Sequence, residues 1–485
     1  MTINKTKRRC ILAAGIILAV ILLISLLLHY PVRILDALTQ EPVAGYGIRI
    51  SPWRIIFEPF LGLLLYFNRS LYALSEVPWA LVWLFSFYFI FILWKGFATG
   101  KRQERKKWLT ARMVDIPLII GGLFIIFLLL IFIRLPGNTI VNHTPDTVLV
   151  TTHCHTEYSH DGLIPQKKLW KWHKRNGFDA FFITDHNHHD KTLDFMKAQR
   201  NGDFEIEPLV MCGEEFSGTN HLSLLGLKRK FSTHGFPDSV AVDSTKASGG
   251  AVIVNHWFDG EHKTLEYYRD LGVDGFEIGN TATDRYYDRK IYNKIKSFCL
   301  ENHLIMNGGL DFHGYGNVCS LWNAFEIPGW HQMSPEEQEE SILHILKTRD
   351  QGKLKVLLYN DRPYYEKKNL FFRPGFTFFN YFRTLNILQI LSWIFWMAIV
   401  TWLTLRISAR NESESGNLFG KIVPVSAMAG ALFMLGLGLI YYIKAGRLAD
   451  FNDVYKEYST LLFYAGIAFL IYSTLVTYFR LMKRR

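Results

Sequence analysis

The amino-acid sequence predicts an α/β domain inserted between transmembrane α-helices. Of its 485 residues, 49% are hydrophobic, and they are concentrated in separate apolar blocks. Between the blocks lies one polar segment, residues 136–382, which is long enough for a full-sized domain. Short β-rich runs alternate with helical patterns in this segment. That alternation indicates a sheet of parallel strands, either open or closed into a barrel.

Two membrane regions are predicted to flank the polar domain. Residues 1–135 form an N-terminal region with three transmembrane helices, and residues 383–485 form a C-terminal region with three more. A helix needs about 20 apolar residues to cross a bilayer. The predicted spans are residues 11–28, 78–94, 116–133, 385–405, 422–443 and 461–479. Residues 53–67 are also apolar, but charged residues and a proline interrupt them, so we expect an interfacial or re-entrant segment there.

Net charge separates the polar domain from the membrane regions. The whole chain carries a formal charge of +11, whereas residues 136–382 contain 27 Lys and Arg against 32 Asp and Glu. This distribution argues against a nucleic-acid partner for the domain. Basic residues collect near the N-terminus, between the second and third spans, and at the C-terminus. Because such residues favour the cytoplasmic side, we expect a multi-pass protein of the plasma (inner) membrane with its polar domain on the extracytoplasmic side.

Histidine and carboxylate side chains gather where the predicted strands of the polar domain end. The strands are residues 148–152, 180–184, 208–212, 222–227, 251–255, 275–278 and 304–307. The side chains concerned are His153, His155, Asp161, Asp185, His186, Glu215, His221, His256, Asp311 and His313. Functional groups of α/β barrels lie at the carboxyl ends of the strands. Alternation also places His153 and His155 on one face, where two imidazoles can grip a metal ion.

Six segments resemble the ordered motifs of the PHP (polymerase and histidinol phosphatase) family. They are THCHTEYSHDG (152–162), ITDHN (183–187), GEEFSG (213–218), HLSLLGL (221–227), GGAVIVNHW (249–257) and GLDFHG (309–314). Together they cover nearly the whole polar segment in the family order. The resemblance implies a distorted (β/α)7 barrel that hydrolyses phosphoesters with the help of divalent metal ions.

The resemblance also implies which residues bind metal. The ligands are His153, His155 and Asp311 for a first ion, Glu215 as a bridge to a second ion with His221 and His256, and Asp161, His186 and His313 for a third. Every one of these positions carries a competent ligand. We therefore expect two or three divalent ions per chain. Imidazole and carboxylate ligands suit Zn, Mn or Fe, and the absence of cysteine ligands argues against a structural zinc.

Four further roles are predicted for residues of the same site. Glu215 is expected to act in catalysis, because two ions that it bridges can share and activate a water molecule. Asp185 either orients a ligand or transfers a proton, unless it only caps a helix. Asn280 and Arg285 are predicted to contact the substrate, against the alternatives of a turn residue and a solvated helix face.

The sequence thus predicts a metal-dependent phosphoric ester hydrolase, either a phosphatase or a phosphodiesterase. A non-catalytic sensor or scaffold that binds a phosphorylated ligand is the alternative. A nuclease of the same family is a second one, disfavoured by the net negative charge of the polar domain. The lipid bilayer is the expected partner. A lipid-linked or envelope phosphoester is the expected substrate, because a soluble one would not require six membrane spans.

Overall fold

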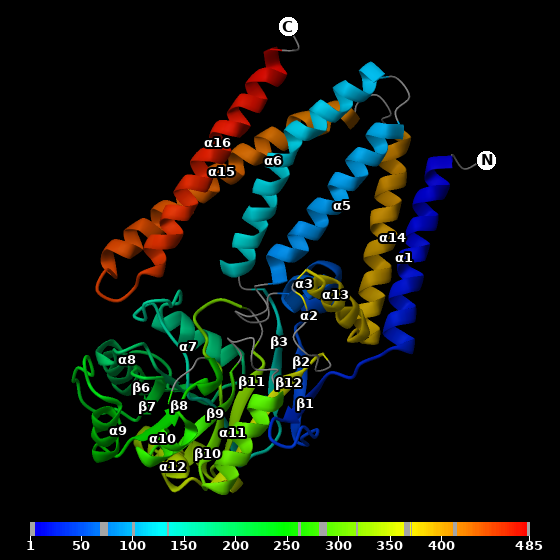
Figure 1. The fold of residues 1–485 in the computed structure, drawn as a ribbon. Coiled ribbons are helices and arrows are strands. Elements are labelled where there is room, and N and C mark those ends of the chain that lie inside the picture. Colours follow the sequence, from blue (N-terminus) through cyan, green and yellow to red (C-terminus); the bar gives the residue numbers. More distant parts are fainter. Residues whose placement is uncertain are drawn as a thin grey trace.

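The computed structural model describes most of the chain. The described residues are 5–67, 76–98, 102–132, 135–259, 263–280, 289–316, 319–362, 369, 371–410 and 415–482. Figure 1 shows a bundle of long helices and, beneath it, a curled sheet with shorter helices around it. The start of the first helix and the end of the last both lie at the end of the bundle that faces away from the sheet.

Six long helices of the described residues form the bundle. They are α1 (Lys5–Leu27), α5 (Glu76–Ala98), α6 (Arg102–Phe132), α14 (Ile387–Arg410), α15 (Ser415–Arg447) and α16 (Val454–Met482). All except α6 are long and apolar enough to cross a membrane. The apolar part of α6 is the shorter stretch Ile116–Leu129, because charged residues fill the first half of this helix. The predicted span 116–133 ends beyond the described residues, and it stays a prediction.

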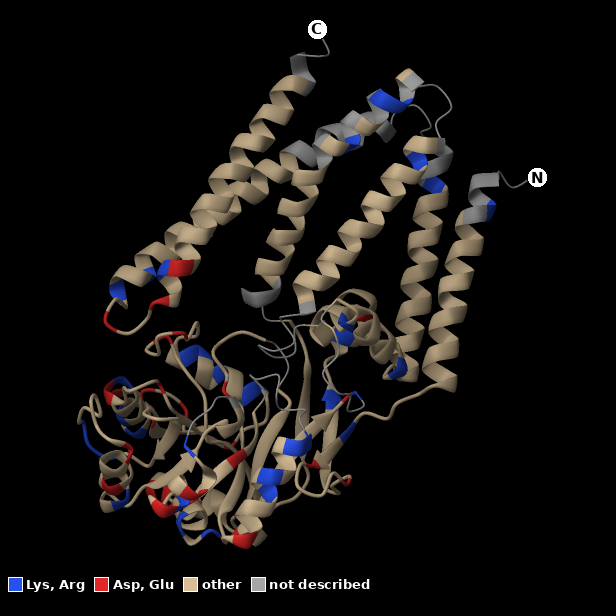
Figure 2. Ribbon diagram, in the orientation of Figure 1, with Lys and Arg blue, Asp and Glu red and all other residues tan. Residues whose placement is uncertain are grey.

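Charged residues separate along the length of the molecule. In Figure 2, Lys and Arg mark the ends of the bundle helices that lie far from the sheet. Asp and Glu lie mostly around the sheet and in the turn between α15 and α16. This arrangement agrees with the charge distribution of the sequence. The side of the membrane on which the sheet lies stays a prediction.

Ten strands of the described chain form one curled, mixed sheet in the order β1-β12-β11-β4-β5-β6-β7-β8-β9-β10. The seven predicted strands are all present, as β4 (Thr147–Thr151), β5 (Ala180–Ile183), β6 (Leu209–Ser217), β7 (His221–Leu225), β8 (Ala251–Val254), β9 (Gly275–Asn280) and β10 (Ile305–Gly309). The prediction of a parallel sheet is wrong for β7, which runs antiparallel to both β6 and β8. The turn between β6 and β7 is too short for the crossover that a parallel connection needs.

Three more strands extend the sheet beyond β4. They are β11 (Leu321–Glu326), β12 (Leu354–Asn360) and β1 (Arg33–Asp36). Each pairs antiparallel with its neighbours. Because β1 lies within residues 1–135, the sheet uses a part of the chain from outside the predicted polar domain. A separate two-stranded sheet joins β2 (Tyr46–Ile50) to β3 (Asn138–Asn142).

The carboxyl ends of β4 and β10 meet, although these strands lie far apart in the sheet order. The backbone N–H of Asp311 donates to the carbonyl of His153, and the N–H of His155 donates to the carbonyl of Phe312, each at 3.0 Å. Below this point, the side-chain amide of Asn323 on β11 bonds both the N–H and the carbonyl of Gly308. The sheet therefore curls so that the loops after its parallel strands converge.

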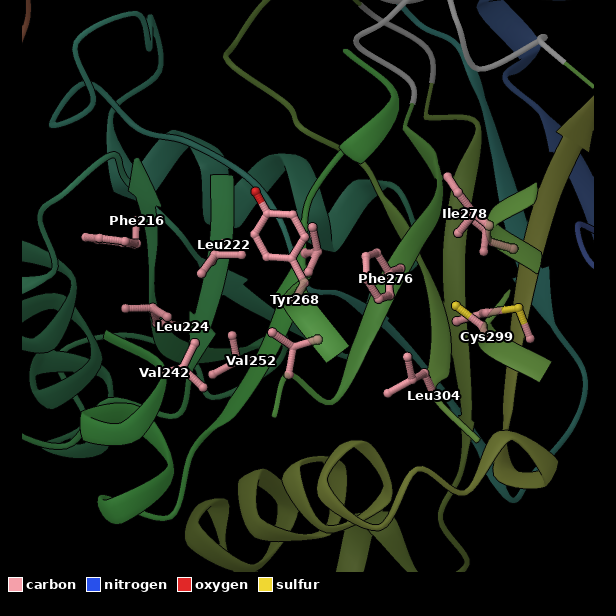
Figure 3. Close-up of a cluster of buried hydrophobic side chains, with 14 of the residues drawn as sticks. Phe216, Leu222, Leu224, Val242, Val252, Tyr268, Phe276, Ile278, Cys299 and Leu304 are labelled. Carbon is pink, nitrogen blue, oxygen red and sulfur yellow. The ribbon is translucent and has the colours of Figure 1, made fainter. Parts of the chain in front are cut away.

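Shorter helices cover the outside of the curled sheet. They are α7 (Gln166–Arg175), α8 (Asp190–Arg200), α9 (Asp238–Ala247), α10 (Leu265–Asp270), α11 (Arg289–Glu301) and α12 (Pro335–Thr348), with 3₁₀ turns at Trp257–Asp259, Trp330–Gln332 and Gln351–Lys353. Figure 3 shows one hydrophobic core between sheet and helices, in which Leu222, Val252 and Phe276 are fully buried. Each such side chain contributes about 1.5–3 kcal/mol to folding. This packing fixes the strand ends on which the polar side chains sit.

Three short helices lie between the bundle and the sheet: α2 (Pro52–Ile56), α3 (Glu58–Phe67) and α13 (Arg373–Arg383). Arg54 and Glu58 form a buried ion pair at 3.4 Å, and the Tyr381 hydroxyl donates to Glu58 at 3.0 Å. The apolar residues 53–67 are therefore two short helices joined by a polar contact, and they do not form a long span.

Candidate metal centre

Two histidines directly after β4 form the first part of the site. His153 and His155 are both fully buried, and their Nε2 atoms lie 3.0 Å apart. Cys154 points the other way, where its Sγ lies 3.1 Å from the carbonyl of Phe182. The alternation expected from the sequence therefore holds, and the two imidazoles face the same space.

Glu215 on β6 lies at the centre of the site. It is fully buried, and both of its carboxylate oxygens face imidazole nitrogens. The nitrogens within 3.0–3.3 Å belong to His153, His155, His186, His221 and His256. The loops after β4, β5 and β8 and the start of β7 thus bring their imidazoles to one carboxylate on β6. The bridging role implied for Glu215 stays a prediction.

Two other carboxylates complete the cluster. Asp311, after β10, places Oδ1 3.3 Å from His153 Nε2 and 3.2 Å from His155 Nε2. Its backbone φ of +50° lies in the left-handed region, which Asp tolerates better than most residues. Asp161, in the loop after β4, places Oδ2 3.0 Å from His313 Nε2 and 3.7 Å from His186 Nε2.

The described residues contain three overlapping groups with the composition of metal sites. They are His153, His155, Glu215 and Asp311; His186, Glu215 and His221; and His155, Asp161, His186 and His313. The first group matches the implied ligands of the first ion together with the bridge. His186 belongs to both of the other groups, because it lies close to Glu215 and to Asp161. His256 lies beside the second group, with its Nε2 atom 3.2 Å from Glu215 Oε1. All nine implied ligands thus lie in one connected cluster.

Hydrogen bonds behind the imidazoles aim their free nitrogens into the cluster. His153 Nδ1 donates to Glu277 Oε1 at 2.8 Å, and His313 Nδ1 donates to the Asp311 carbonyl at 2.9 Å. Each ring thus turns its Nε2 toward the centre, as metal-binding histidines do. Among the described residues, Glu215 Oε2 has no hydrogen-bond partner, although three imidazole nitrogens surround it. A buried, unpartnered carboxylate oxygen facing nitrogen lone pairs fits divalent cations.

Burial and charge shift the pKa values of the cluster in opposite directions. Burial alone lowers the pKa of His155, but the carboxylates of Asp311 and Glu215 beside it outweigh burial and raise the pKa to about 10. Burial raises the pKa of Glu215, but the neighbouring imidazoles, led by His153, hold it well below its ordinary value. The carboxylates therefore stay ionised and demand a positive partner. A proton and a metal ion compete for that place.

Asp185 lies behind the cluster. It is fully buried, and its two carboxylate oxygens accept from the backbone N–H and the hydroxyl of Thr156 at 2.6 and 2.7 Å. Burial raises its pKa to about 6. The helix-cap alternative is wrong, because the residue before α8 is His189. The contacts favour a role in holding the loop that begins at Thr156.

The two predicted substrate contacts have different outcomes. Asn280, at the end of β9, is fully buried and donates to Glu277 Oε2 and Asp311 Oδ2, both at 3.2 Å. Its amide thus supports a ligand, and contact with substrate stays a prediction. Arg285 lies outside the described residues.

Sequence reasoning missed three residues that support the ligands. Glu277 holds His153 from behind, and Asn255 donates to Glu215 Oε1 at 2.8 Å. Ser159 lies 3.2 Å from His155 Nδ1 and donates to Asp161 at 3.0 Å. One signal was available for Glu277: a charged residue inside the otherwise apolar run GFEIG of β9. Such a residue needs a buried partner.

One family model and several solved structures are similar to parts of this chain. Residues 151–247 match the model of the PHP domain. Three solved structures are similar. A two-domain protein from Bacteroides vulgatus with a predicted PHP-like metal-dependent phosphoesterase is 18% identical, with a TM-score of 0.33 over 44% of this chain and 65% of that one. A candidate metal-dependent phosphoesterase from Bifidobacterium adolescentis is 14% identical, with a TM-score of 0.27 over 35% and 88%. An amidohydrolase from Chromobacterium violaceum with bound sulfate and no metal is 12% identical, with a TM-score of 0.28 over 44% and 98%.

The chain spans about two thirds of the Bacteroides protein's length, and no curated protein matches it. The family match begins at the last residue of β4 and covers the three strands β5 to β7. Residues 151–247 thus match the PHP domain, and six of the nine candidate metal ligands lie within that match.

Proposed function

We propose that this protein is a membrane-bound, metal-dependent phosphoesterase whose site holds two or three divalent ions. The convergence of imidazoles on the buried, unpartnered oxygen of Glu215 carries this proposal. A scaffold that binds only a phosphorylated ligand would not require so many acidic and imidazole groups around one buried carboxylate. The cluster has the composition of Zn, Mn or Fe sites.

The implied ligand assignment is kept as part of the proposal. His153, His155 and Asp311 would hold one ion, and Glu215 would bridge it to a second. The remaining ligands are His221 and His256 for the second ion and Asp161, His186 and His313 for the third. Bound divalent ions would supply charge neutralisation at phosphorus and a nucleophilic water at neutral pH.

The protein's own side chains would then fix the geometry. Glu277 holds His153 by a hydrogen bond, and Asn255 holds Glu215 in the same way. The metal-binding atoms of His153 and Glu215 would therefore not need to reorganise during the reaction. Asp185 keeps the loop after β4 closed through Thr156. We assign Asp185 a positioning role and propose that Arg285 contacts the phosphate group.

We further propose that the substrate is presented at the membrane surface, as a lipid-linked or envelope phosphoester on the extracytoplasmic side. Support comes from Tyr158 and Leu163, which flank Asp161 and pack against the apolar cluster of α6, α15 and α16. The ligand loop thus lies next to α15 and α16, which are long and apolar enough to span a membrane. A soluble substrate would not need this neighbourhood.

The first experiment measures hydrolysis by the purified full-length protein. Aryl phosphate and bis-aryl phosphodiester substrates, with Mn²⁺ or Zn²⁺ added, should be cleaved, and chelator or His153→Ala should abolish the activity. The exposed His344→Ala, in α12, is the matched control and should keep full activity. Metal binding without turnover of any phosphoester would instead favour the sensor alternative.

The second experiment tests the substrate class. Full-length protein in bilayers is compared with the same protein in detergent, on a soluble aryl phosphate and on a phospholipid-linked phosphoester. A preference for the lipid substrate that appears only in bilayers supports the proposal. Equal rates on both substrates in both environments would leave the helices as an anchor. Tight, salt-dependent binding of oligonucleotides would favour the nuclease alternative.

A further inference from the structure

The turn between α15 and α16, residues 448–453, reaches across to the loop that carries Asp161. The backbone N–H groups of Asp453 and Val454 donate to the carbonyl of His160 at 3.0 and 3.2 Å. Lys444, at the end of α15, donates to the Glu157 carboxylate at 2.8 Å. These partners are almost 300 residues apart in the sequence. The membrane helices therefore contact the site loop directly.

Asn452 makes the most specific of these contacts. Its side-chain amide donates to the carbonyls of Ser159 and Gly162, both at 2.7 Å, and more weakly to that of Glu157 at 3.4 Å. Its Oδ1 accepts from the backbone N–H of Tyr455 at 3.1 Å and so caps α16. Asn452 is 3% exposed, which protects these bonds from water. One side chain thus joins the start of a bundle helix to the site loop.

The two main acceptors of Asn452 stand on either side of Asp161. Ser159 also donates to Asp161 Oδ1 at 3.0 Å and lies 3.2 Å from His155 Nδ1. From the other direction, the Tyr315 hydroxyl donates to the Asp161 carbonyl at 2.6 Å. Asp161 is thus held between contacts to the sheet region and contacts to the bundle, with its carboxylate toward His313.

We propose that Asn452 is a positioning residue for the metal site of Asp161, His186 and His313, so that the α15–α16 turn sets the affinity of that site. This inference rests on the proposed metal-dependent function. It makes α15 and α16 part of the catalytic unit. Through these helices, the bilayer would influence the affinity for the ion that Asp161 holds. The sites centred on His153 and His221 make no contact with Asn452 among the described residues.

The test uses full-length protein in detergent and Mn²⁺ itself as the probe, with free Mn²⁺ measured by its EPR signal. Asn452→Asp and Asn452→Ser both keep an oxygen that can cap α16, and both remove the amide donors. We expect the affinity of one ion to fall about 10- to 100-fold, the usual effect of losing support behind a ligand, while the other ions bind as in the wild type. The control Thr460→Ala removes a side chain that bonds only within α16, and it should leave all affinities unchanged.

Thermal unfolding of each variant is measured in parallel, because a purely structural contact would lower the melting temperature without changing the affinity of one ion selectively. Unchanged affinities in both Asn452 variants, with wild-type protein that binds Mn²⁺, would overturn this inference and leave the proposed function intact. An equal loss at every ion would overturn it too. Wild-type protein that binds Mn²⁺ but cleaves no phosphoester would refute the proposed function, while the selective loss would still support the role of Asn452.

Discussion

Glu277 offers the sharpest test of how the metal centre is held. It is fully buried and accepts from three donors: His153 Nδ1 at 2.8 Å, the backbone N–H of His256 at 3.0 Å, and the side chain of Asn280 at 3.2 Å. Glu277→Gln keeps the size of the side chain but exchanges one acceptor oxygen for an NH₂ group. That group must face at least one of the three donors.

The expected cost follows from this mismatch. A buried donor without a partner costs about 1–3 kcal/mol. Loss of a carboxylate behind a metal-binding histidine lowers metal affinity about 10- to 100-fold, or about 1.4–2.7 kcal/mol at the ion. We therefore expect Glu277→Gln to weaken binding of the ion that His153 holds by this factor. The ion held by Asp161 and His313 should be much less affected.

Mn²⁺ titration of the full-length protein, followed by EPR, measures this effect ion by ion. The control is Glu326→Gln, which makes the same chemical change at an exposed position at the end of β11. Glu277→Asp keeps the charge and should recover part of the affinity. If Glu277→Gln binds every ion within twofold of the wild type, the hydrogen bond to His153 does not support the metal centre and this reasoning fails.

Three further predictions follow from the same structure. A Cβ at Gly309 would overlap the Glu277 carboxylate, so Gly309→Ala should weaken metal binding about 10-fold, whereas Gly308→Ala, which meets only apolar side chains, should lower the melting temperature and spare the affinity. Burial lowers the pKa of His173 to about 3, so the unfolded chain takes up the proton first as the pH falls below about 6.5. Stability should therefore drop by about 2 kcal/mol between pH 6.5 and pH 5, and denaturant unfolding in chelator should show this loss in the wild type but not in His173→Leu. Asp185→Asn can keep both bonds to its loop, so the phosphoesterase rate should stay within about tenfold of the wild type; a loss of 100-fold or more would show proton transfer instead.

The strands that carry the site could be predicted from sequence because their signals are local. β5 and β8 are short apolar runs bounded by polar residues, and in each case a histidine follows the run within three residues. The edge strands could not be found in this way. β1 is only four residues long and pairs with β12 more than 300 positions away. Neither strand has a sequence pattern that indicates which strand it pairs with. The antiparallel direction of β7 follows from the short turn between β6 and β7, and the pattern of apolar runs does not take turn length into account.

The candidate ligands could be predicted because their chemistry is uncommon and their order resembles that of a known family. Their supports were missed because an amide or a carboxylate behind a ligand looks like any other polar residue. Asn255 precedes His256 and resembles an ordinary polar residue after a strand, yet its side chain donates a hydrogen bond to Glu215. Asn452 reads as a turn residue between two helices. Only the fold shows that its amide meets the loop around Asp161.

These contacts bear on which part of the chain can work alone. Residues 136–382 contain the candidate metal ligands, but β1 comes from between α1 and α2, and Asn452 comes from between α15 and α16. Without β1, the edge of the sheet at β12 would expose unpaired backbone groups, which favours aggregation. Without Asn452, two carbonyls beside Asp161 would lose their donor. The folding unit therefore extends into both membrane regions. The site is therefore complete only after β1 has paired with β12 and the turn between α15 and α16 has docked on the loop around Asp161.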